Sequence, residues 1–517
     1  MYLPDSTFDV LVVGAGPAGL AAAAALLRHR VHCRIVDRNP YPTPGTRCPN
    51  LWRRTLHTLD QIGADTDVLR ENSVPMRAKV FTVGDRTVSI PTTPETGSEA
   101  GYDGDWPMPL LVSQEIQERA LAEHLYRSGC PVERDTTALV TGQDDEYVHV
   151  LLRPGGRVDE YVRARYVVAA DGEDSGVREQ MGVEWSTHEH YDVAWWQIDA
   201  RVEGLALGPE QEHLYHTPDQ HLGIVPLAGG GHRLFTASTR VPPGTEPGPE
   251  DVERLAREIS GSDLRLRETA GLWSRTPRSG LAARWTKGRV VLLGESARVF
   301  PMPVHALNTG IQDAANLAWK LAAELRERTD GSLLRTYETE RRAVAKTVID
   351  RGHLVLRLGV TPVPQERIGA GLDARAPRLR TEPEVTYPGS PLSRWASEGS
   401  ITPGDWVGSA RVETALGPET VDRLQGDGRW LVLLPPGADP RLRHSFTGHP
   451  LHPRVISDAA LDTGGPDDGR MMTVVRPDGH LGASLPPQES GALLFYLDTA
   501  AGTAPTAPLG ARSGSRR

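Results

Sequence analysis

A glycine-rich turn near the amino terminus places the strongest constraint on the fold of this 517-residue chain. The turn, GAGPAG at 14–19, follows the apolar run FDVLVV at 8–13 and opens an Ala/Leu-rich segment that predicts a helix. HCRIVDR at 32–38 predicts the next strand. Glycines at these positions allow a tight turn and a close approach of a pyrophosphate to the start of the helix. The sequence therefore predicts an α/β fold with a Rossmann-like nucleotide site.

Two acidic residues extend this site. Asp37 stands at the end of the second predicted strand, where a carboxylate can accept from a ribose hydroxyl, and Arg38 follows it. Asp171, in the segment ADGEDSGVR, also follows a predicted strand, and Gly172 lets the chain pass close to a nucleotide. The alternative for the first motif is a glycine-rich turn that binds no nucleotide. The alternative for Asp171 and Gly172 is an ordinary turn.

The charge balance and the cysteines exclude several classes of function. Asp and Glu number 67 against 57 Lys and Arg, a net charge of -10, which disfavours nucleic acid and anionic membrane as partners. Cys33, Cys48 and Cys130 have neither metal-ligand spacing nor a disulfide framework. The first residues lack a signal-peptide pattern, and the longest apolar run, 20–27, is too short to span a membrane. We expect a cytoplasmic bacterial protein without a metal.

The order of the elements predicts three domains. Short alternating runs between 186 and 280 indicate a mostly antiparallel sheet inserted into the α/β domain, to which the strand at 288–296 returns. Long helices are expected at 308–326 and 333–360, followed by a Pro/Arg-rich linker at 363–400. We therefore expect a nucleotide-binding domain at 1–75, 106–185 and 281–385, a substrate domain at 76–105 and 186–280, an α/β C-terminal domain at 395–505 and a disordered tail at 506–517.

These motifs stand in a definite order that ends with NTGIQDAANLAWKL at 308–321. In that order the chain resembles the FAD-dependent aromatic hydroxylases (class A flavoprotein monooxygenases), above all their actinobacterial branch that tailors polyketides. The resemblance covers about 8–385, and the C-terminal segment resembles the thioredoxin-like domain of some members, without a CxxC motif. It is carried by GAGPAG, Arg47, Arg54, Thr55, Leu56, Gln114, Glu118, Asp171, Gly172, Arg178, Gly294 and the 308–321 segment.

The resemblance implies that FAD is the cofactor. The glycine turn would cradle its pyrophosphate and Asp37 would hold the adenosine ribose. Glu295 stands where the family has an Asp bonded to the ribityl chain, and Asn308 begins a helix whose positive end supports the flavin. The expected FAD-binding set is Gly14, Gly16, Ala18, Gly19, Asp37, Arg38, Arg47, Gln114, Asp171, Gly172, Gly294, Glu295, Leu307 and Asn308.

One segment departs from the family pattern, which reads roughly GDAAHxxPPxGGxGxNxGxxDA. Glu295 replaces its Asp, Arg298 replaces its His, and Met302 replaces its second Pro. The Gly-rich part becomes VHAL at 304–307, one residue shorter and without glycine. Trp52 also stands where relatives often carry Gln or His. Glycine lets backbone approach the flavin, so Cβ atoms and a shorter loop change the pocket in which the family activates oxygen.

This departure leaves three interpretations open. In the first, the chain is a working hydroxylase or Baeyer–Villiger monooxygenase that uses NAD(P)H. In the second, oxygen activation is lost and FAD is a structural element, as in relatives that catalyse decalin-forming (4+2) cyclisation in spirotetramate and spirotetronate pathways. In the third, no flavin binds. We favour the second, a cyclase of a large apolar polyketide-type natural product in antibiotic biosynthesis; a non-catalytic ligand-binding flavoprotein is a minor alternative.

Four residues are candidates for catalysis, each with an alternative. His305 is either an acid or base near the flavin edge or a surface histidine. Arg298 is either a cation for substrate or flavin or an ordinary surface or ion-paired arginine. Trp195 and Trp196 lie on a predicted strand of the substrate domain, where alternation predicts that one of them faces the substrate cavity. Both tryptophans could equally serve packing alone.

Overall fold

The computed structural model describes most of the chain. Val304 of the altered loop, most of the predicted linker and the predicted tail lie outside the described residues. The described residues are 6–42, 47–92, 106, 108–302, 305–327, 331–360, 385–395, 401–426, 428–462 and 469–502.

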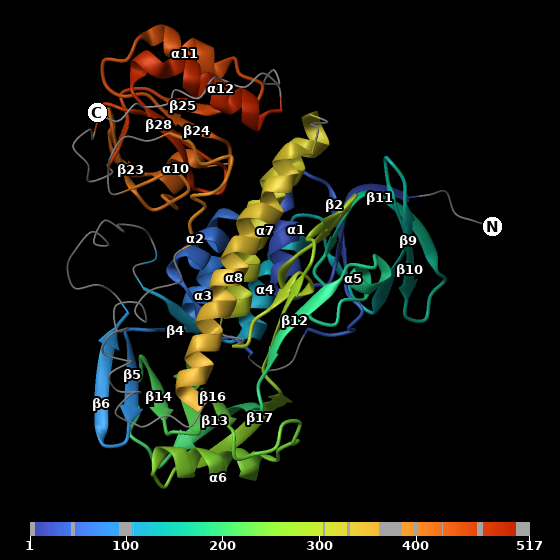
Figure 1. Ribbon diagram of the computed structural model, residues 1–517, viewed down its shortest axis with the longest axis vertical. Helices are drawn as coiled ribbons and strands as arrows, with labels where there is room; N and C mark the ends of the chain where they lie inside the picture. Colours follow the sequence, from blue (N-terminus) through green and yellow to red (C-terminus); the bar gives the residue numbers. More distant parts are fainter. Residues whose placement is uncertain are drawn as a thin grey trace, which may run out of the picture.

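Four parallel strands form the centre of an eight-stranded sheet (Figure 1). In spatial order they are β20 (Val290–Leu292), β11 (Glu160–Ala169), β1 (Ser6–Val13) and β2 (Cys33–Val36). Their apolar residues are buried, as expected of a parallel sheet covered on both faces. The helix α1 (Pro17–Arg28) connects β1 to β2, so the predicted strand–helix–strand unit is confirmed. The sheet is completed by β8 (Val132–Glu133), β9 (Thr136–Gln143), β10 (Val148–Pro154) and β19 (Thr286–Lys287).

Two long helices, α7 (Ala306–Glu327) and α8 (Ser332–Val360), run beside each other through the molecule (Figure 1). α7 also packs on α1, and small residues permit a close approach. A Cβ built on Gly310 would lie 3.1 Å from the Cβ of Ala18. Both helices were predicted from the sequence, and their bounds are confirmed to within a turn. The shorter helices of this region are α2 (Arg53–Gln61), α3 (Thr66–Glu71), α4 (Gln114–Arg127) and α5 (Gly176–Gln180).

A seven-stranded sheet in the order β17, β13, β16, β15, β14, β5, β6 forms a second layer. Its neighbours are antiparallel except β14 and β5, which are parallel. The helix α6 (Pro249–Ser260) covers one face, and the opposite face meets the α/β part of the molecule (Figure 1). The strands are β5 (Ala78–Val83), β6 (Arg86–Pro91), β13 (Ala194–Glu203), β14 (Gln211–His216), β15 (Gln220–Pro226), β16 (His232–Ser238) and β17 (Arg265–Arg275).

Two three-stranded sheets lie beside these layers. One contains β12, β18 and β21, and the other contains β3, β7 and β4. Their bounds are β3 (Asn50–Leu51), β4 (Ser73–Pro75), β7 (Leu110–Val112), β12 (Trp185–His190), β18 (Arg278–Ala282) and β21 (Arg298–Val299).

The C-terminal part contains a four-stranded sheet, β25-β24-β27-β28, and a three-stranded sheet, β23-β22-β26. It sits at one end of the molecule, next to α2 and one end of α7 (Figure 1). Its elements are β22 (Arg411–Thr414), β23 (Gly417–Thr420), α10 (Val421–Gln425), β24 (Leu431–Leu433), α11 (Pro440–Thr447), β25 (Arg454–Ile456), β26 (Ala460–Leu461), β27 (Met472–Val475), β28 (Leu481–Leu485) and α12 (Ser490–Ala500).

A buried ionic cluster joins the C-terminal part to α7 and α8. Glu340 of α8 accepts from Lys320 Nζ at 2.6 Å and from Arg476 at 2.7 Å, and Arg476 also pairs with Asp478 at 2.6 Å. All four side chains are at most 3% exposed. Charges buried this deeply are tolerated only when each has its partners. The C-terminal part is therefore integral to the packing of α7 and α8.

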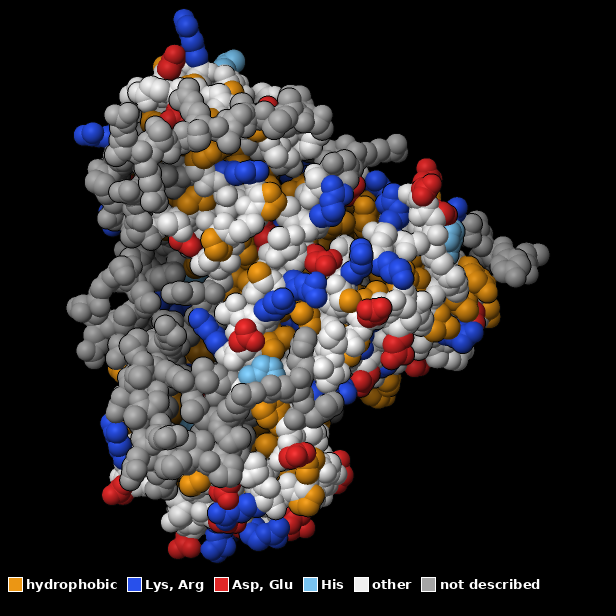
Figure 2. Space-filling view, in the orientation of Figure 1, with side chains coloured by type: hydrophobic (Ala, Val, Ile, Leu, Met, Phe, Trp, Pro, Cys, Tyr) orange, Lys and Arg blue, Asp and Glu red, His pale blue; other side chains and the backbone are white. Residues whose placement is uncertain are grey.

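The outer surface carries charges of both signs. On the face shown in Figure 2, the described basic side chains are interspersed with acidic ones and form no continuous basic patch. Within the described ranges, no helix combines the length and the apolar character needed to cross a membrane.

Candidate functional site

The predicted nucleotide motifs meet at one edge of the parallel sheet. Gly14 follows β1, Asp37 follows β2, Asp171 follows β11 and Gly294 follows β20. These four strands are adjacent and parallel, so the four segments emerge side by side at their carboxyl ends. Ligands of open α/β sheets bind at this edge. Motifs that are up to 280 positions apart in the sequence therefore meet at one site.

The glycine turn leaves space in front of α1. Gly14 has a φ of +104°, and a Cβ there would lie 2.3 Å from the carbonyl oxygen of Ala170. A Cβ on Gly19 would lie 1.9 Å from the carbonyl oxygen of Gly14. A Cβ on Gly16 would meet no protein atom within 4 Å. Gly14 and Gly19 are thus required by the turn itself, whereas Gly16 borders open space at the helix N-terminus, where a pyrophosphate fits.

Asp37 braces the glycine turn from the neighbouring strand. Its buried carboxylate accepts from the backbone N–H of Ala15 at 2.6 Å and from that of Asn39 at 2.7 Å. Arg134 lies 3.8 Å from the same carboxylate. Arg38, the next residue, is exposed. A carboxylate held in this way keeps lone pairs available at the edge of the site.

The Asp171 carboxylate accepts hydrogen bonds from the turn that follows it and from Ser296. Its carboxylate accepts from Ser175 Oγ at 2.5 Å, from Ser296 Oγ at 2.9 Å and from the N–H of Val177 at 3.1 Å. Gly172, with a φ of +90°, donates its N–H to Ser296 Oγ at 3.1 Å. These bonds tie the end of β11 to the segment after β20. Sequence reasoning missed Ser175 and Ser296, because hydroxyls of this kind occur throughout the chain.

Arg47 and Gln114, far apart in the sequence, come together at the start of α4. The Arg47 N–H donates to Gln114 Oε1 at 3.4 Å, and Gln114 Nε2 donates to Glu118 Oε1 at 2.8 Å. The Arg47 guanidinium lies 5.1 Å from the centre of the Trp273 ring on β17. Burial raises the pKa of Glu118 above its usual range. Arg47 therefore bridges the nucleotide edge and the seven-stranded sheet.

Glu295 is partly buried and lies near several charged side chains. Burial is the main cause of its raised pKa, and the nearby carboxylate of Glu173 adds to it. Arg275, Arg298 and Arg47 act in the opposite direction. Gly294, just before it, has a φ of +61° and packs toward Ala18. Gly294 thus lies against the first turn of α1, next to the glycine turn.

The first turn of α7 holds the segment that precedes α2. Asn308 Oδ1 accepts from the N–H of Trp52 at 3.0 Å, and its Nδ2 donates to the carbonyl of Asn50 at 2.7 Å. Asn308 and Leu307 are both buried. The Asn308 amide is therefore committed to the backbone of Asn50 and Trp52, which makes it a positioning residue of this turn.

Arg298 lies in the core, so it is not a surface arginine, and the alternative of an ion-paired arginine is confirmed. Its Nη2 donates to Asp313 Oδ2 at 2.7 Å, and Arg341 Nε donates to the other oxygen of Asp313 at 2.6 Å. All three side chains are fully buried. The Arg298 guanidinium also lies 4.5 Å from the ring centre of Phe300. The structure places this candidate in an ion pair with Asp313 of α7, and its charge also acts on Glu295 at the nucleotide edge.

His305 stands directly before α7 and is partly buried. Burial, followed by the positive charges of Lys79 and Arg351, lowers its pKa to about 4. The imidazole is therefore neutral at physiological pH and can accept a proton there only as a weak base. Lys79 belongs to β5, so His305 lies between α7 and the seven-stranded sheet.

A row of rings crosses the sheet face that meets the α/β part. Trp195, Phe235, His221, His216 and Phe81 come one each from the adjacent strands β13, β16, β15, β14 and β5. Successive ring centres are 5.4, 5.4, 4.3 and 6.1 Å apart. We call these five residues the ring row.

The ring row decides between the two tryptophan candidates. Trp195 is fully buried on this face, in one apolar cluster with Trp52 and Met302. Trp196 points to the opposite face, where its Nε1 donates to the carbonyl of Thr245 at 3.0 Å. The predicted alternation is confirmed, and Trp195 is the one that faces the nucleotide-binding part. Trp52 and Met302, which also depart from the family pattern, belong to the same apolar cluster as Trp195.

The histidines of the ring row were missed by sequence reasoning. Their Nδ1 atoms are 3.0 Å apart, both rings are buried, and His216 Nε2 has no hydrogen-bond partner among the described residues. Burial lowers the pKa of His216 to about 4 and that of His221 well below its usual value. Neither carries charge at neutral pH. The two histidines meet because the register of β14 and β15 places His216 opposite His221, and the sequence alone does not give that register.

We expect these histidines to make the fold acid-sensitive. A histidine that titrates near 6.5 when unfolded and near 4 when folded binds fewer protons in the native state between these values. The free energy of unfolding should therefore fall as pH drops from 6.5 toward 4, by up to about 3 kcal/mol for His216. Urea unfolding of wild type and His216→Phe at pH 8 and pH 5 measures this. The wild type should lose more stability than the variant, and equal losses would contradict the assignment.

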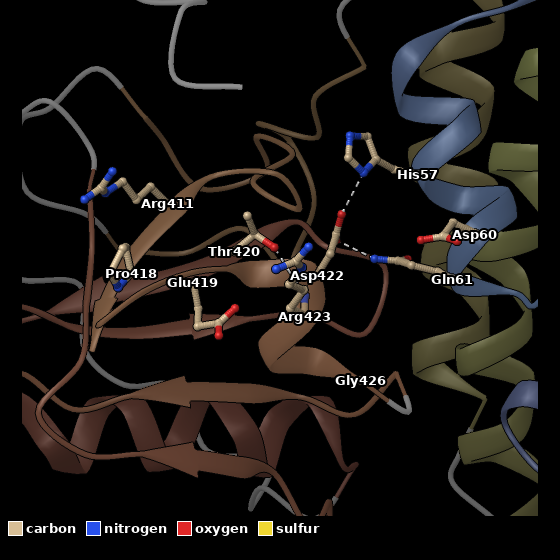
Figure 3. Close-up of a pocket in the computed structure, with 10 residues that line it drawn as sticks. All are labelled: His57, Asp60, Gln61, Arg411, Pro418, Glu419, Thr420, Asp422, Arg423 and Gly426. Carbon is tan, nitrogen blue, oxygen red and sulfur yellow. Dashed lines mark hydrogen bonds and ion pairs between the residues drawn. The ribbon is translucent and has the colours of Figure 1, made fainter. Parts of the chain in front are cut away.

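A separate pocket of about 390 Å³ lies between α2 and the C-terminal part (Figure 3). Asp422 of α10 is contacted by two side chains of α2: His57 Nδ1 at 3.2 Å, and the amide of Gln61, which donates to it. The His57 ring centre lies 5.5 Å from that of Trp406. None of the residues predicted to bind FAD lines this pocket. Its contacts join α2 to the C-terminal part.

Comparisons with known proteins match this geometry. A family model described as an FAD binding domain matches residues 7–352. The rifampicin monooxygenase of Streptomyces venezuelae is 30% identical over 376 residues, which cover 69% of this chain and 73% of that protein.

Two solved structures share the fold. OxyS anhydrotetracycline hydroxylase from Streptomyces rimosus has a TM-score of 0.77 and 24% identity, covering 96% of this chain and 100% of that one. The Diels-Alderase PyrE3 of the pyrroindomycin pathway has a TM-score of 0.70 and 24% identity, covering 92% of this chain and 96% of that one.

Proposed function

Because the chain belongs to the FAD-binding-domain family of aromatic hydroxylases, we propose that it acts on a large apolar polyketide-type natural product between its FAD site and the ring row. The family and its cofactor, FAD, were expected from the sequence and are confirmed. The chain is an enzyme of this flavoprotein family. The finer assignments below concern the substrate, the reaction and the residues.

In this proposal the sheet edge holds FAD. The pyrophosphate occupies the space beside Gly16, where the first amides of α1 favour an anion. Asp37 meets the adenosine ribose, Arg47 the phosphates, and Glu295 the ribityl hydroxyls. FAD supplies hydride acceptance and oxygen activation in redox members of the family. Asn308 fixes Trp52 against the start of α7, so that the apolar cluster begins where the cofactor site ends.

We propose that the reaction is a non-redox (4+2) cyclisation, with FAD as a structural element. The observation that carries this proposal is the row of aromatic and imidazole rings on the sheet face next to Met302 of the altered segment. Trp195 and Phe235 are stacked at 5.4 Å and 7°, and His216 and His221 beside them are neutral. The ring row carries no formal charge at neutral pH, and a row of rings of this kind can fold a flexible polyene into a reactive conformer.

A turnover experiment tests the reaction. A linear polyene that carries a diene and a dienophile is incubated anaerobically with the purified flavoprotein, without NAD(P)H. We expect a cyclised isomer of unchanged mass, formed at least about a hundredfold faster than without protein, a barrier reduction of about 2.7 kcal/mol. The no-protein reaction is the control, because such cyclisations also proceed spontaneously. A strict requirement for both NAD(P)H and oxygen would overturn the proposal.

The second candidate is an NAD(P)H-dependent monooxygenase that hydroxylates a polyketide or inserts oxygen beside a carbonyl. It is favoured by the relatives, since rifampicin monooxygenase and the anhydrotetracycline hydroxylase are named for oxygen insertion. It requires NADPH to bleach the flavin absorbance near about 450 nm under anaerobic conditions. Recovery of the ligand unchanged under every condition would instead favour a non-catalytic binding protein. We also propose that the C-terminal domain is thioredoxin-like.

A further inference from the structure

We propose that Cys33 and Cys130 are a redox modification site, at which an intramolecular disulfide forms and is reversed by thiols. Their Sγ atoms are 3.7 Å apart. They are separated by 97 positions, and β2 and β8 bring them together: Ile35 pairs with Val132, and extending that register places Cys33 opposite Cys130. This inference is independent of the reaction proposed above.

The register provides the backbone separation that a disulfide needs. Neighbouring strands lie about 4.8 Å apart, within the Cα separation of roughly 4.4–6.8 Å that disulfides span. A disulfide S–S distance is about 2.05 Å, so the two Sγ atoms must approach by about 1.7 Å. Rotation about the Cα–Cβ bonds provides a movement of that size without displacing the strands.

The surroundings favour this pair over the third cysteine. Cys33 is partly exposed, Cys130 beside it is buried, and the Cys130 thiol donates to the Cys33 carbonyl at 3.2 Å. A hydrogen bond from Cys33 lowers the pKa of Cys130, which favours the nucleophilic thiolate. Cys48 is buried and has no neighbouring thiol among the described cysteines, and burial raises its pKa to about 12. We therefore expect Cys48 to stay a thiol under conditions that oxidise the pair.

The chemistry balances with a peroxide as the oxidant. The Cys130 thiolate attacks one oxygen of hydrogen peroxide, the O–O bond breaks, and hydroxide leaves, giving a sulfenic acid. The Cys33 sulfur attacks the Cys130 sulfur, its proton passes to the departing oxygen, and water leaves as the S–S bond forms. Two thiols and one peroxide thus give one disulfide and two waters. An external dithiol reverses the bond by exchange.

The bond would form on the strand pair whose opposite end borders the proposed adenosine end of the FAD site. β2 ends next to Asp37, and the Asp37 N–H donates to the carbonyl of Glu133 on β8 at 2.9 Å. A disulfide at the other end of this short strand pair would fix β2 and β8 covalently. The oxidised protein should therefore release FAD more slowly during dilution than the reduced protein.

The test uses the full-length flavoprotein treated with hydrogen peroxide and analysed without reductant. We expect an intact-mass loss of about 2 Da, the two hydrogens removed. Titratable thiols in denaturant should fall from three to one and return with dithiothreitol. Peptide mapping should identify the Cys33–Cys130 linkage. Cys33→Ser and Cys130→Ser should each abolish the mass loss, and the matched control Cys48→Ser should retain it.

Three outcomes would overturn the proposal. One is a disulfide between two molecules of the protein. Another is stable sulfinic acid at Cys130 without a linked peptide. The third is three titratable thiols and no linked peptide at peroxide doses that already oxidise methionines. Because these readouts follow thiols and mass, they are independent of substrate turnover.

Discussion

A Gly16→Val protein is expected to fold and to be colourless. A Cβ at Gly16 would meet no protein atom within 4 Å, so valine fits the polypeptide. The same open space is where the proposed pyrophosphate meets the first turn of α1, and three added carbons would fill it. We expect the ratio of flavin to protein absorbance to fall at least about tenfold, the equivalent of about 1.4 kcal/mol or more of lost binding.

The matched control is a valine at the last glycine of the same turn, Gly19. A Cβ at Gly19 would lie 1.9 Å from the carbonyl oxygen of Gly14, so Gly19→Val should destabilise the fold as well as remove FAD. Thermal unfolding separates the two effects, with Gly16→Val unfolding near the temperature of FAD-stripped wild type. Full flavin occupancy in Gly16→Val would show that the cofactor lies elsewhere.

The largest loss of stability is expected from Asp313→Asn. Asp313 is fully buried and pairs with Arg298 at 2.7 Å and Arg341 at 2.6 Å, both fully buried as well. Neutralising it leaves two guanidinium groups in the core without a counter-charge. Breaking a buried pair in this way costs about 3–5 kcal/mol. Urea unfolding followed by tryptophan fluorescence measures the loss.

An exposed ion pair provides the control for Asp313. Asp263 is 93% exposed and lies 3.4 Å from Arg257, so Asp263→Asn should change the free energy of unfolding by less than about 1 kcal/mol. The two variants remove the same charge in different surroundings. A loss below about 1 kcal/mol for Asp313→Asn would mean that water or a shifted side chain compensates the two arginines.

Features set by local sequence could be predicted. The glycine turn, the strands around it and the two long helices follow from residues that are near one another in the chain. Trp195 and Trp196 were separated by the two-residue period of a strand alone.

Features set by register and long-range packing could not be predicted. Glu340 and Arg476 are 136 positions apart, and no periodicity links them. His216 and His221 meet only because β14 and β15 pair as they do. Arg298 illustrates the same limit: a single arginine in an unusual motif position gives no indication that its partner is Asp313, one helix away. The arginine at this position has its ionic partner in the core.

The shared ionic cluster also constrains how this protein can be recombined with its relatives. A chimera that exchanges residues 401–502 for the corresponding module of a relative would leave Glu340 and Lys320 facing a new surface. Unless that module also brings an arginine and an aspartate where Arg476 and Asp478 stand, a buried charge loses its counterpart. A chimera cut only at the boundary of the C-terminal part is therefore expected to be destabilised. The segment to exchange is the C-terminal part together with the turns of α7 and α8 that carry Lys320 and Glu340.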